Sequence, residues 1–314
     1  SIFASIRGFV EEAGPGAIAG VILNRLGSEG HETYLKKACA GMDIPVYGML
    51  PKMSELQWPE RHLGLQASQE QEFPNIEILS EKAENHLDLD GILNLMEIPD
   101  CSDASNASAD RKIDSVKKIG VARDEAFHFY YRANLDWLKT SGAEMVQFSL
   151  LKDSELPQNL DGLLIGGGFP EIYAETMSEN HSMRQSLKKA IVSGMPCYAE
   201  CGGLMLLAES LQTREGRSYP MTGMIPGSVR MTERLQHFGY CQARFEEGGT
   251  FRGHEFHYSN WEEESNLANA WTVRRHADGS ERKEGYQRGN LHASYVHLYF
   301  PKAAQVLSPI FGLD

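Results

Sequence analysis

The sequence PCYAECGG, residues 196–203, places two cysteines four positions apart and follows the second with two glycines. The apolar residues before Cys201 predict a strand, and GLMLLAESL (203–211) predicts a helix directly after it. A strand that ends on a nucleophile, turns on glycines and enters a helix has the layout of a nucleophile elbow. We therefore predict that Cys201 is a nucleophile at the carboxyl end of a strand.

The predicted position of Cys201 favours its reactive form. A thiol at a helix N-terminus meets partial positive charge, which favours the thiolate. Backbone N–H groups just beyond it can bind a developing oxyanion. Cys197 lies inside the predicted strand and is interpreted as a packing residue. The alternative, two ordinary core cysteines, is disfavoured because strand, turn and helix follow one another in the order of an elbow.

A cysteine nucleophile needs a base, and the chain contains 11 histidines. His297 lies in the apolar, strand-like sequence ASYVHLYF (293–300). Alone it would be read as a core residue, but together with an elbow cysteine it becomes the candidate base. The histidines of GHEFHY (253–258) are three apart, so this stretch is not the H-E-x-x-H zinc motif. The CxxxC pair also lacks a second ligand pair, and no metal site is predicted.

The pattern after residue 115 predicts a doubly wound parallel sheet, because strands and helices alternate and sites then lie at the carboxyl ends of the strands. We expect strands at 117–124, 144–151, 160–171 and 195–200, helices at 125–143 and 203–211, and a strand-rich remainder. GGGFPE (166–171) would end at the same edge as Cys201 and could bring backbone N–H groups to the oxyanion. An ordinary strand-to-helix turn is the plainer alternative.

The N-terminal region predicts a parallel βαβ unit. It has a strand buried on both faces within 16–27, a helix within 30–42 and a strand at 44–51. The chain opens in a helix and contains no G-x-x-x-x-G-K-[ST] phosphate loop, so we expect only part of a nucleotide-binding domain. Residues 98–115 are rich in Ser, Asp, Asn and Ala and predict a linker between domains at 1–97 and 116–314.

Composition excludes several classes of protein. The formal net charge of −13 argues against a nucleic-acid partner. No stretch of eighteen apolar residues predicts a membrane span, and the first residues do not resemble a signal peptide. The chain contains 5 cysteines, an odd and scattered set that indicates free thiols and a cytoplasmic location.

Several stretches together resemble one family, the glutamine-dependent cobyrinic acid a,c-diamide synthases. They are GVILNRLGSEGHETYLKKA, VYGMLPK, WPERHLGL, KIGVARDEAFHFYY, GGGFPE, AECGGLM, GHEFHYS and ASYVHLYF, in the family's order. The resemblance implies an α/β fold: a class I glutamine amidotransferase with a flavodoxin-like doubly wound sheet. It would be preceded by the C-terminal half of a P-loop-type ATP-binding α/β domain.

The resemblance also implies an activity. Enzymes of this family use ATP, Mg²⁺ and ammonia from glutamine to amidate the a and c acetate carboxylates of cobyrinic or hydrogenobyrinic acid, in cobalamin biosynthesis. The expected partners are glutamine, ATP and a corrinoid or related tetrapyrrole, with a homodimer left open. Because the phosphate loop is absent, no tightly bound cofactor is expected in this chain.

By its motifs, the resemblance assigns Cys201 as the nucleophile and His297 as the residue that raises its nucleophilicity. The residues expected to bind the oxyanion and glutamine are Gly167, Gly168, Gly202 and Glu171. The residues expected to bind the tetrapyrrole and the nucleotide are, respectively, Arg61 with His62 and Asn24 with Arg25.

The chain departs from related amidotransferases in its triad. Many of them carry a glutamate two residues after the histidine, where this chain has Tyr299. We therefore predict a Cys–His dyad, with His297 oriented by a backbone carbonyl, a carboxylate from elsewhere or water. Three other functions stay open: a nickel sirohydrochlorin a,c-diamide synthase, a glutaminase-like binding domain without synthetase activity, and a peptide-cleaving cysteine hydrolase. The linker and PERHLGL (59–65) disfavour the last.

Overall fold

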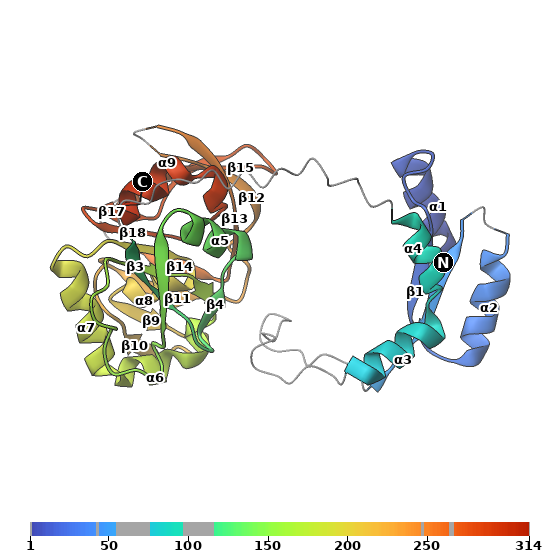
Figure 1. Cartoon of the computed structure of the whole chain (residues 1–314), viewed down its shortest axis with the longest axis horizontal. Coiled ribbons are helices and arrows are strands. Elements are labelled where there is room, and N and C mark those ends of the chain that lie inside the picture. Colours follow the sequence, from blue (N-terminus) through green and yellow to red (C-terminus); the bar gives the residue numbers. More distant parts are fainter. Residues whose placement is uncertain are drawn as a thin grey trace. The chain divides into compact units, whose positions relative to one another are not determined.

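The computed structural model describes residues 2–41, 44–54, 76–96, 116–245, 248–263 and 267–313. The chain divides into two compact units, Ser1–Ala107 and Ser108–Asp314 (Figure 1). The expected linker at 98–115 lies outside the described residues. No described helix is long and apolar enough to cross a membrane.

The first unit contains the expected βαβ arrangement. Its elements are α1 (Ile2–Ala13), β1 (Val21–Leu26), α2 (Glu29–Cys39), β2 (Val46–Pro51), α3 (Ile76–His86) and α4 (Leu89–Leu95). β1 and β2 pair in parallel, which confirms the predicted unit. α2 begins after Ser28 because the hydroxyl of this residue accepts a hydrogen bond from the backbone N–H of His31 at 3.2 Å.

The expectation that β1 is buried on both faces was wrong. Leu23 and Leu26 are buried in a small core with Ile6 of α1, whereas Ile22 is 47% exposed. Within the described residues this sheet has only two strands. A continuous apolar strand predicts a sheet with both faces covered, and here one face of β1 is left partly exposed.

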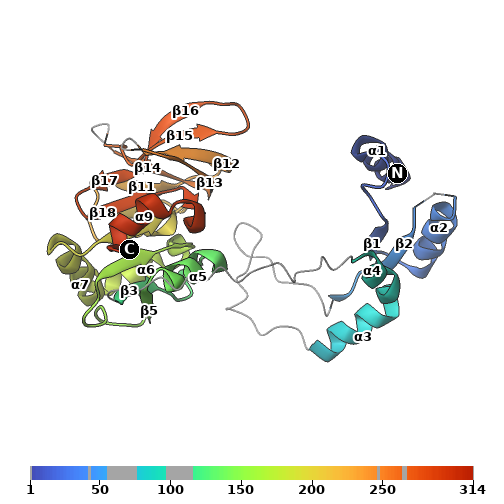
Figure 2. The ribbon, with the colours of Figure 1, turned by 45° about the horizontal axis from the view of Figure 1, so that its top comes forward.

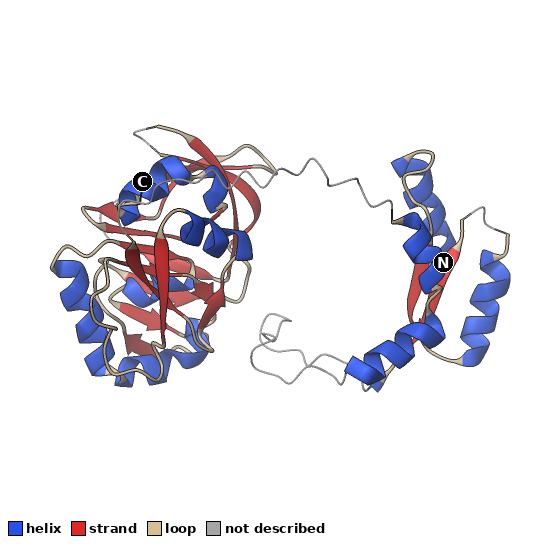
Figure 3. Ribbon diagram, in the orientation of Figure 1, coloured by secondary structure: helices blue, strands red, loops and turns tan. Residues whose placement is uncertain are grey.

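The second unit is built on a six-stranded sheet (Figure 3). Its elements as far as the elbow are β3 (Lys117–Ala122), β4 (Phe127–Phe129), α5 (Arg132–Thr140), β5 (Ala143–Phe148), β6 (Gly162–Ile165), β7 (Gly167–Gly168), the 3₁₀ helix η4 (Pro170–Tyr173), α6 (Ala174–Glu179), α7 (His181–Val192), β8 (Cys197–Glu200) and α8 (Gly202–Leu207). The remaining elements are β9 (Ser210–Gln212), β10 (Ser218–Pro220), β11 (Ser228–Met231), β12 (His237–Arg244), β13 (Thr250–His257), β14 (Ser259–Glu262), β15 (Trp271–Arg275), β16 (Glu281–Glu284), β17 (Tyr286–Arg288), β18 (Leu291–Ser294), β19 (His297–Leu298), the 3₁₀ helix η5 (Phe300–Lys302) and α9 (Ala304–Phe311).

The strand order of this sheet is β17-β18-β8-β6-β3-β5. All neighbours pair in parallel except the edge strand β17. Numbered along the chain, the parallel strands take the order 2-1-3-4-5 of flavodoxin-like folds. The predicted fold class is confirmed. β6 and β8 are adjacent, so the segments that follow them meet at one edge of the sheet.

The sheet is covered on both faces, as a doubly wound fold requires. On one face, α7 and α8 pack through residues that include Leu187 and Leu206. On the other face, α5 and α9 pack through residues that include Leu138 and Phe311. Parallel strands buried on both faces explain why β6 and β8 are continuous apolar runs in the sequence.

The strand-rich remainder forms two further sheets, with the orders β10-β9-β11-β14 and β16-β15-β12-β13-β19 (Figure 2). The second of these adds Cys241, Phe251 and Trp271 to the core formed with α5 and α9. The sequence ASYVHLYF is therefore divided: β18 belongs to the main sheet, and β19 pairs with β13.

Two predicted helices differ from the structure. The helix expected at 125–143 begins only at Arg132, because Asp124 accepts hydrogen bonds from the backbone N–H groups of Ala126 and Phe127 and holds them in a turn. β4 follows this turn and pairs with β7. The helix expected to reach residue 211 ends at Leu207, because the chain turns into β9.

Candidate active site

Cys201 lies in a sharp turn between β8 and α8. Its backbone has φ 49° and ψ −101°, which is strained for a residue with a side chain. The turn is held by a hydrogen bond from its own N–H to the carbonyl of Ser294, at 2.7 Å. Cys197 lies buried in β8, and burial raises the pKa of its thiol to about 12. The two cysteines therefore occupy different environments.

The glycine-rich segment after β6 lies against this turn. Gly203 donates a backbone hydrogen bond to the carbonyl of Gly166 at 3.1 Å, and Gly202 lies beside the backbone nitrogen of Gly168. A Cβ on Gly168 would lie 1.9 Å from the carbonyl oxygen of Ala126. Only glycine fits there, and this brings the backbone of residue 168 next to the start of α8.

His297 is buried at the junction of β19 and β13, with 4% of its surface exposed. Its ring stacks on His254 at 4.9 Å between centroids and meets the edge of Phe129 at 5.1 Å. A Cβ on Gly167 would lie 2.7 Å from Cε1 of His297, so the absence of a side chain there makes room for the ring. Rings and backbone thus confine the imidazole on several sides.

Two acidic groups, Cys201 and Glu200, act on the charge of the histidine. Burial alone would lower the pKa of His297, but hydrogen bonds with Cys201 and Glu200 raise it to about 10. Nδ1 of His297 lies 3.5 Å from Oε2 of Glu200. The imidazole can therefore accept the proton of the thiol and hold it as an imidazolium.

Glu171 is the second residue of the 3₁₀ helix η4, just beyond the glycine-rich segment, where Pro170 lies against Gly202. Burial raises the pKa of Glu171 to about 7, against the smaller lowering effects of its own backbone N–H and of the positive charge of Arg214. A carboxylate in this condition gains by meeting an ammonium group.

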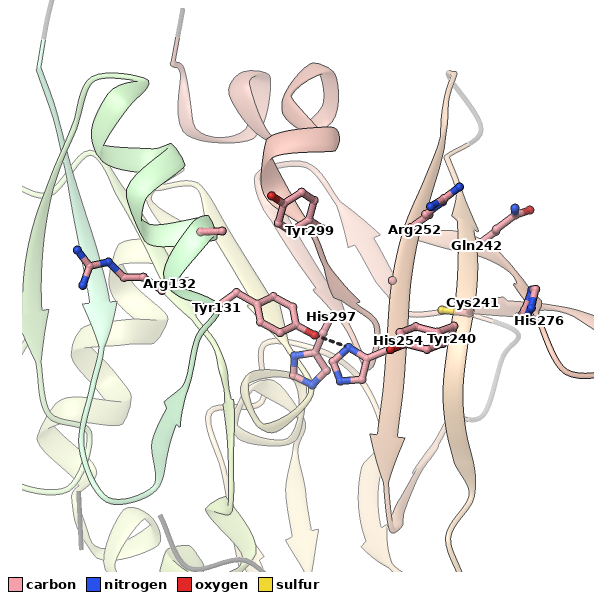
Figure 4. Close-up of a pocket in the computed structure, with 12 residues that line it drawn as sticks. Tyr131, Arg132, Tyr240, Cys241, Gln242, Arg252, His254, His276, His297 and Tyr299 are labelled. Carbon is pink, nitrogen blue, oxygen red and sulfur yellow. Dashed lines mark hydrogen bonds between the residues drawn. The ribbon is translucent and has the colours of Figure 1, made fainter. Parts of the chain in front are cut away.

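A cavity of about 800 Å³ opens beside His297 (Figure 4). Tyr131 and His254 form one part of its wall, with a hydrogen bond of 2.7 Å between the tyrosine hydroxyl and Nδ1 of His254. Burial and the nearby charge of His297 lower the pKa of His254 to about 4, so that this ring is neutral near pH 7. Tyr299 is 43% exposed and lies on the wall, apart from the ring of His297 (Figure 4).

The structure brings together most of the residues singled out in the second unit. Cys201, His297 and the backbone of Gly167, Gly168 and Gly202 meet at the carboxyl edge of the sheet, with Glu171 at its margin. This adjacency agrees with the sheet topology but does not test their roles.

Two of the residues singled out in the first unit lie in β1. Asn24 and Arg25 are exposed at the end of β1, and Arg25 has a φ of 61°. Arg61 and His62 lie outside the described residues. In the described ranges, no group of three or more His, Cys, Asp or Glu side chains could hold a metal ion.

Sequence reasoning missed three residues that surround His297. Glu200 could have been found, because strand alternation places it on the same face as Tyr198, at the end of a buried strand that leads into the elbow. Phe129 and His254 gave no such signal, since their place depends on the pairing of β4 with β7 and of β13 with β19.

The fold of the second unit is that of a class I glutamine amidotransferase. The sequence pattern of the CobB/CobQ-like glutamine amidotransferase domain matches residues 118–305. A cobyrinate a,c-diamide synthase of Listeria innocua is 42% identical over 308 residues, which are 94% of this chain and 67% of the relative. One of Caldanaerobacter subterraneus is 42% identical over 310 residues, 95% of this chain and 68% of the relative. A solved glutamine amidotransferase is 17% identical and covers 62% of this chain and 99% of its own, with a TM-score of 0.48.

The chain therefore belongs to the CobB/CobQ-like glutamine amidotransferase family, and the resemblance drawn from the sequence is confirmed. It spans about two thirds of the length of these two relatives.

Proposed function

We propose that Cys201 and His297 hydrolyse glutamine to glutamate and ammonia. The observation that carries this proposal is the strained turn that presents Cys201 at the start of α8, beside a buried histidine whose pKa the cysteine raises. A thiol so placed is deprotonated by its neighbour and lies next to backbone N–H groups.

The reaction begins when Nε2 of His297 takes the proton of Cys201. The thiolate attacks the side-chain amide carbon of glutamine and forms a tetrahedral intermediate. The C–N bond then breaks, His297 returns the proton to the leaving nitrogen, and ammonia departs. Water cleaves the glutamyl thioester with His297 as the base, which releases glutamate and restores the thiol.

The backbone N–H groups of Gly168 and Gly202 are proposed to bind the oxyanion of the intermediate, with Gly167 making room for His297. One such donor contributes roughly two to three orders of magnitude in rate. Glu171 is proposed to bind the α-ammonium group of glutamine, because a carboxylate whose pKa is raised by desolvation gains most from a positive partner.

The ammonia is proposed to amidate the a and c acetate carboxylates of cobyrinic or hydrogenobyrinic acid in an ATP-dependent ligase reaction. The relatives named cobyrinate a,c-diamide synthases support this choice of substrate. We assign glutamine hydrolysis to residues 116–314 and the ligation to the region that includes 1–97, joined through 98–115. In that region, Asn24 and Arg25 would contact the nucleotide, and Arg61 and His62 the carboxylates of the tetrapyrrole.

Mg²⁺ would accompany ATP in such a reaction. The described residues offer no cluster of carboxylates that could hold the ion, so we assign no ligand and no step to it.

The test compares Cys201→Ser with a matched variant, Cys197→Ala. We expect Cys201→Ser to lose at least about a hundredfold of the glutamate release and Cys197→Ala to stay close to wild type, since Cys197 is a packing residue. Equal activity of wild type and Cys201→Ser would overturn the proposal.

The substrate is tested in the full-length enzyme with cobyrinic acid, ATP and either glutamine or an ammonium salt. Cys201→Ser should block amide formation from glutamine and leave the reaction with ammonia intact, as mass spectrometry of the product would show. Amidation of nickel sirohydrochlorin in preference to cobyrinic acid would change the assigned macrocycle and leave the assignment of Cys201 unaffected.

A further inference from the structure

The carboxylate nearest to His297 belongs to Glu200, the residue that directly precedes Cys201. Its Oε2 lies 3.5 Å from Nδ1 of His297, and both side chains are almost completely buried. The position two residues after the histidine, where many related enzymes carry a glutamate, is Tyr299, which is 43% exposed.

Glu200 is itself held in place by two donors to its other oxygen. Oε1 accepts a hydrogen bond from the hydroxyl of Tyr198 at 3.1 Å and from the backbone N–H of Leu298 at 3.0 Å. Leu298 directly follows His297 in β19. One carboxylate therefore contacts both the ring of the histidine and the backbone beside it.

We propose that Glu200 is the positioning residue of the site: it accepts the Nδ1–H of His297 and so leaves Nε2 free to take the proton of Cys201. This inference rests on the proposed glutamine hydrolysis. It assigns the role of a triad carboxylate to the residue before the nucleophile. Glu200 reaches the histidine because of how the strands pair, and not because the two residues have the usual spacing in the sequence.

The proton follows a complete cycle in this arrangement. It leaves the sulfur of Cys201, resides on Nε2 of His297 and passes to the nitrogen of the departing ammonia. Glu200 takes up no proton in this cycle and stabilises the imidazolium, as carboxylates do in other triads.

The other titratable groups around the pair do not compete for this role. Burial raises the pKa of the surrounding tyrosines and lowers the pKa of the neighbouring histidine, so that all are neutral near pH 7. They are Tyr198 of β8, Tyr130 and Tyr131 before α5, and His254 of β13. Among these described groups, Glu200 is the one that can carry a negative charge against Nδ1.

The decisive variant is Glu200→Gln, because glutamine separates the two functions of the side chain. Its amide oxygen can still accept from Tyr198 and Leu298, so a purely structural brace would survive. Its amide nitrogen would face Nδ1 as a donor, which favours the imidazole tautomer with the proton on Nε2. That tautomer cannot accept the thiol proton.

We expect kcat for glutamine hydrolysis to fall by about a hundredfold or more in Glu200→Gln, with KM changed less than about threefold. The rate of Cys201 alkylation by iodoacetamide should also fall at pH 6.5. Without the carboxylate the pKa of His297 falls, so less of the thiolate–imidazolium pair forms and the thiolate appears only at higher pH.

The matched control is Glu284→Gln. Glu284 is a second buried glutamate, and its oxygens accept hydrogen bonds from the hydroxyl of Ser294 and the backbone N–H of Tyr295. It should keep kcat within about threefold. If Glu200→Gln keeps kcat within the same range and alkylates with an unchanged pH profile, Glu200 is structural and the proposal is wrong.

A measurement on the wild-type protein covers the case in which Glu200→Gln does not fold. The ¹⁵N resonances of His297 should report a proton on Nδ1 at every pH at which the enzyme is active. A neutral ring protonated on Nε2 would overturn the proposal. This result would differ from a failure of the proposed function, in which wild-type protein releases no glutamate from glutamine.

Discussion

Two segments meet at Cys201, and each carries a glutamate: Glu200 is buried and Glu171 is half-buried. At the end of β8, Glu200 has hydrogen bonds from Tyr198 and Leu298 and a contact with His297. In the segment after β7, Glu171 has only its own backbone N–H and the more distant charge of Arg214 to stabilise its ionised form, among the residues the structure describes.

From this difference we expect that the two carboxylates serve different steps. A carboxylate whose oxygens already have partners can orient a neighbour but has little capacity for a ligand. A carboxylate that burial leaves short of partners gains from a cationic ligand. We therefore expect changes at the end of β8 and at His297 to alter mainly kcat, and changes at Glu171 to alter mainly KM.

The largest expected effect is that of His297→Asn. Asparagine cannot take the thiol proton, so kcat should fall by about a hundredfold or more while KM for glutamine changes little. His276→Asn is the control, because His276 lines the same cavity and should keep kcat within about threefold. Similar losses in both variants would mean that the cavity, rather than the base, has been damaged.

Gly168→Ala should have the next largest effect, and it tests a backbone donor rather than either carboxylate. The added Cβ would lie 1.9 Å from the carbonyl of Ala126, so the segment must shift, and its distance from Gly202 changes. A displaced oxyanion donor should lower kcat by about ten- to a hundredfold. Gly216→Ala tests a glycine with positive φ in open space, and steady-state assays should find its kcat unchanged.

Glu171→Gln tests the role of the second carboxylate through the pH dependence of KM for glutamine. In wild type, KM should rise as the pH falls through about 7, because the pKa of Glu171 is raised to about 7 and the protonated acid cannot pair with an ammonium group. In Glu171→Gln, KM should be about tenfold higher at pH 8 and nearly independent of pH. The exposed Glu175 of α6 provides the control, Glu175→Gln. A fall in kcat with unchanged KM would place Glu171 among the groups that act on the reaction itself.

Tyr299→Phe should have the smallest effect. The tyrosine is partly exposed on the cavity wall, and losing one hydroxyl should cost less than about tenfold in glutamate release. Activity as low as that of His297→Asn would identify Tyr299 as a working partner of the histidine and contradict the role given to Glu200.

The elements of the main sheet were predictable from the sequence because each of their signals is local. Buried parallel strands are short apolar runs, and glycines mark the turns that follow them, as at Gly168 and Gly202. Cys201 was found in the same way. The short strand β4 was missed because Asp124 forms a turn that resembles a helix start in sequence.

The surroundings of the histidine were predictable only in part. His297 itself was recognised, but β19 belongs to another sheet than β18, and only this pairing with β13 brings His254 onto the ring. Non-local pairing of this kind leaves no periodic signal in a single sequence. Glu200 lies at the end of a buried strand, which is a local signal, but its contact with His297 depends on the same non-local pairing.

The backbone conformation of Cys201 lowers the stability of the folded protein. A φ of 49° with ψ of −101° costs a residue with a Cβ of the order of 1–3 kcal/mol, and glycine escapes most of this cost. Cys201→Gly should therefore melt at a higher temperature than Cys201→Ala, although neither can act as a nucleophile. The folded protein carries this strain at all times, and the reactive thiol at this position is retained at the expense of thermal stability.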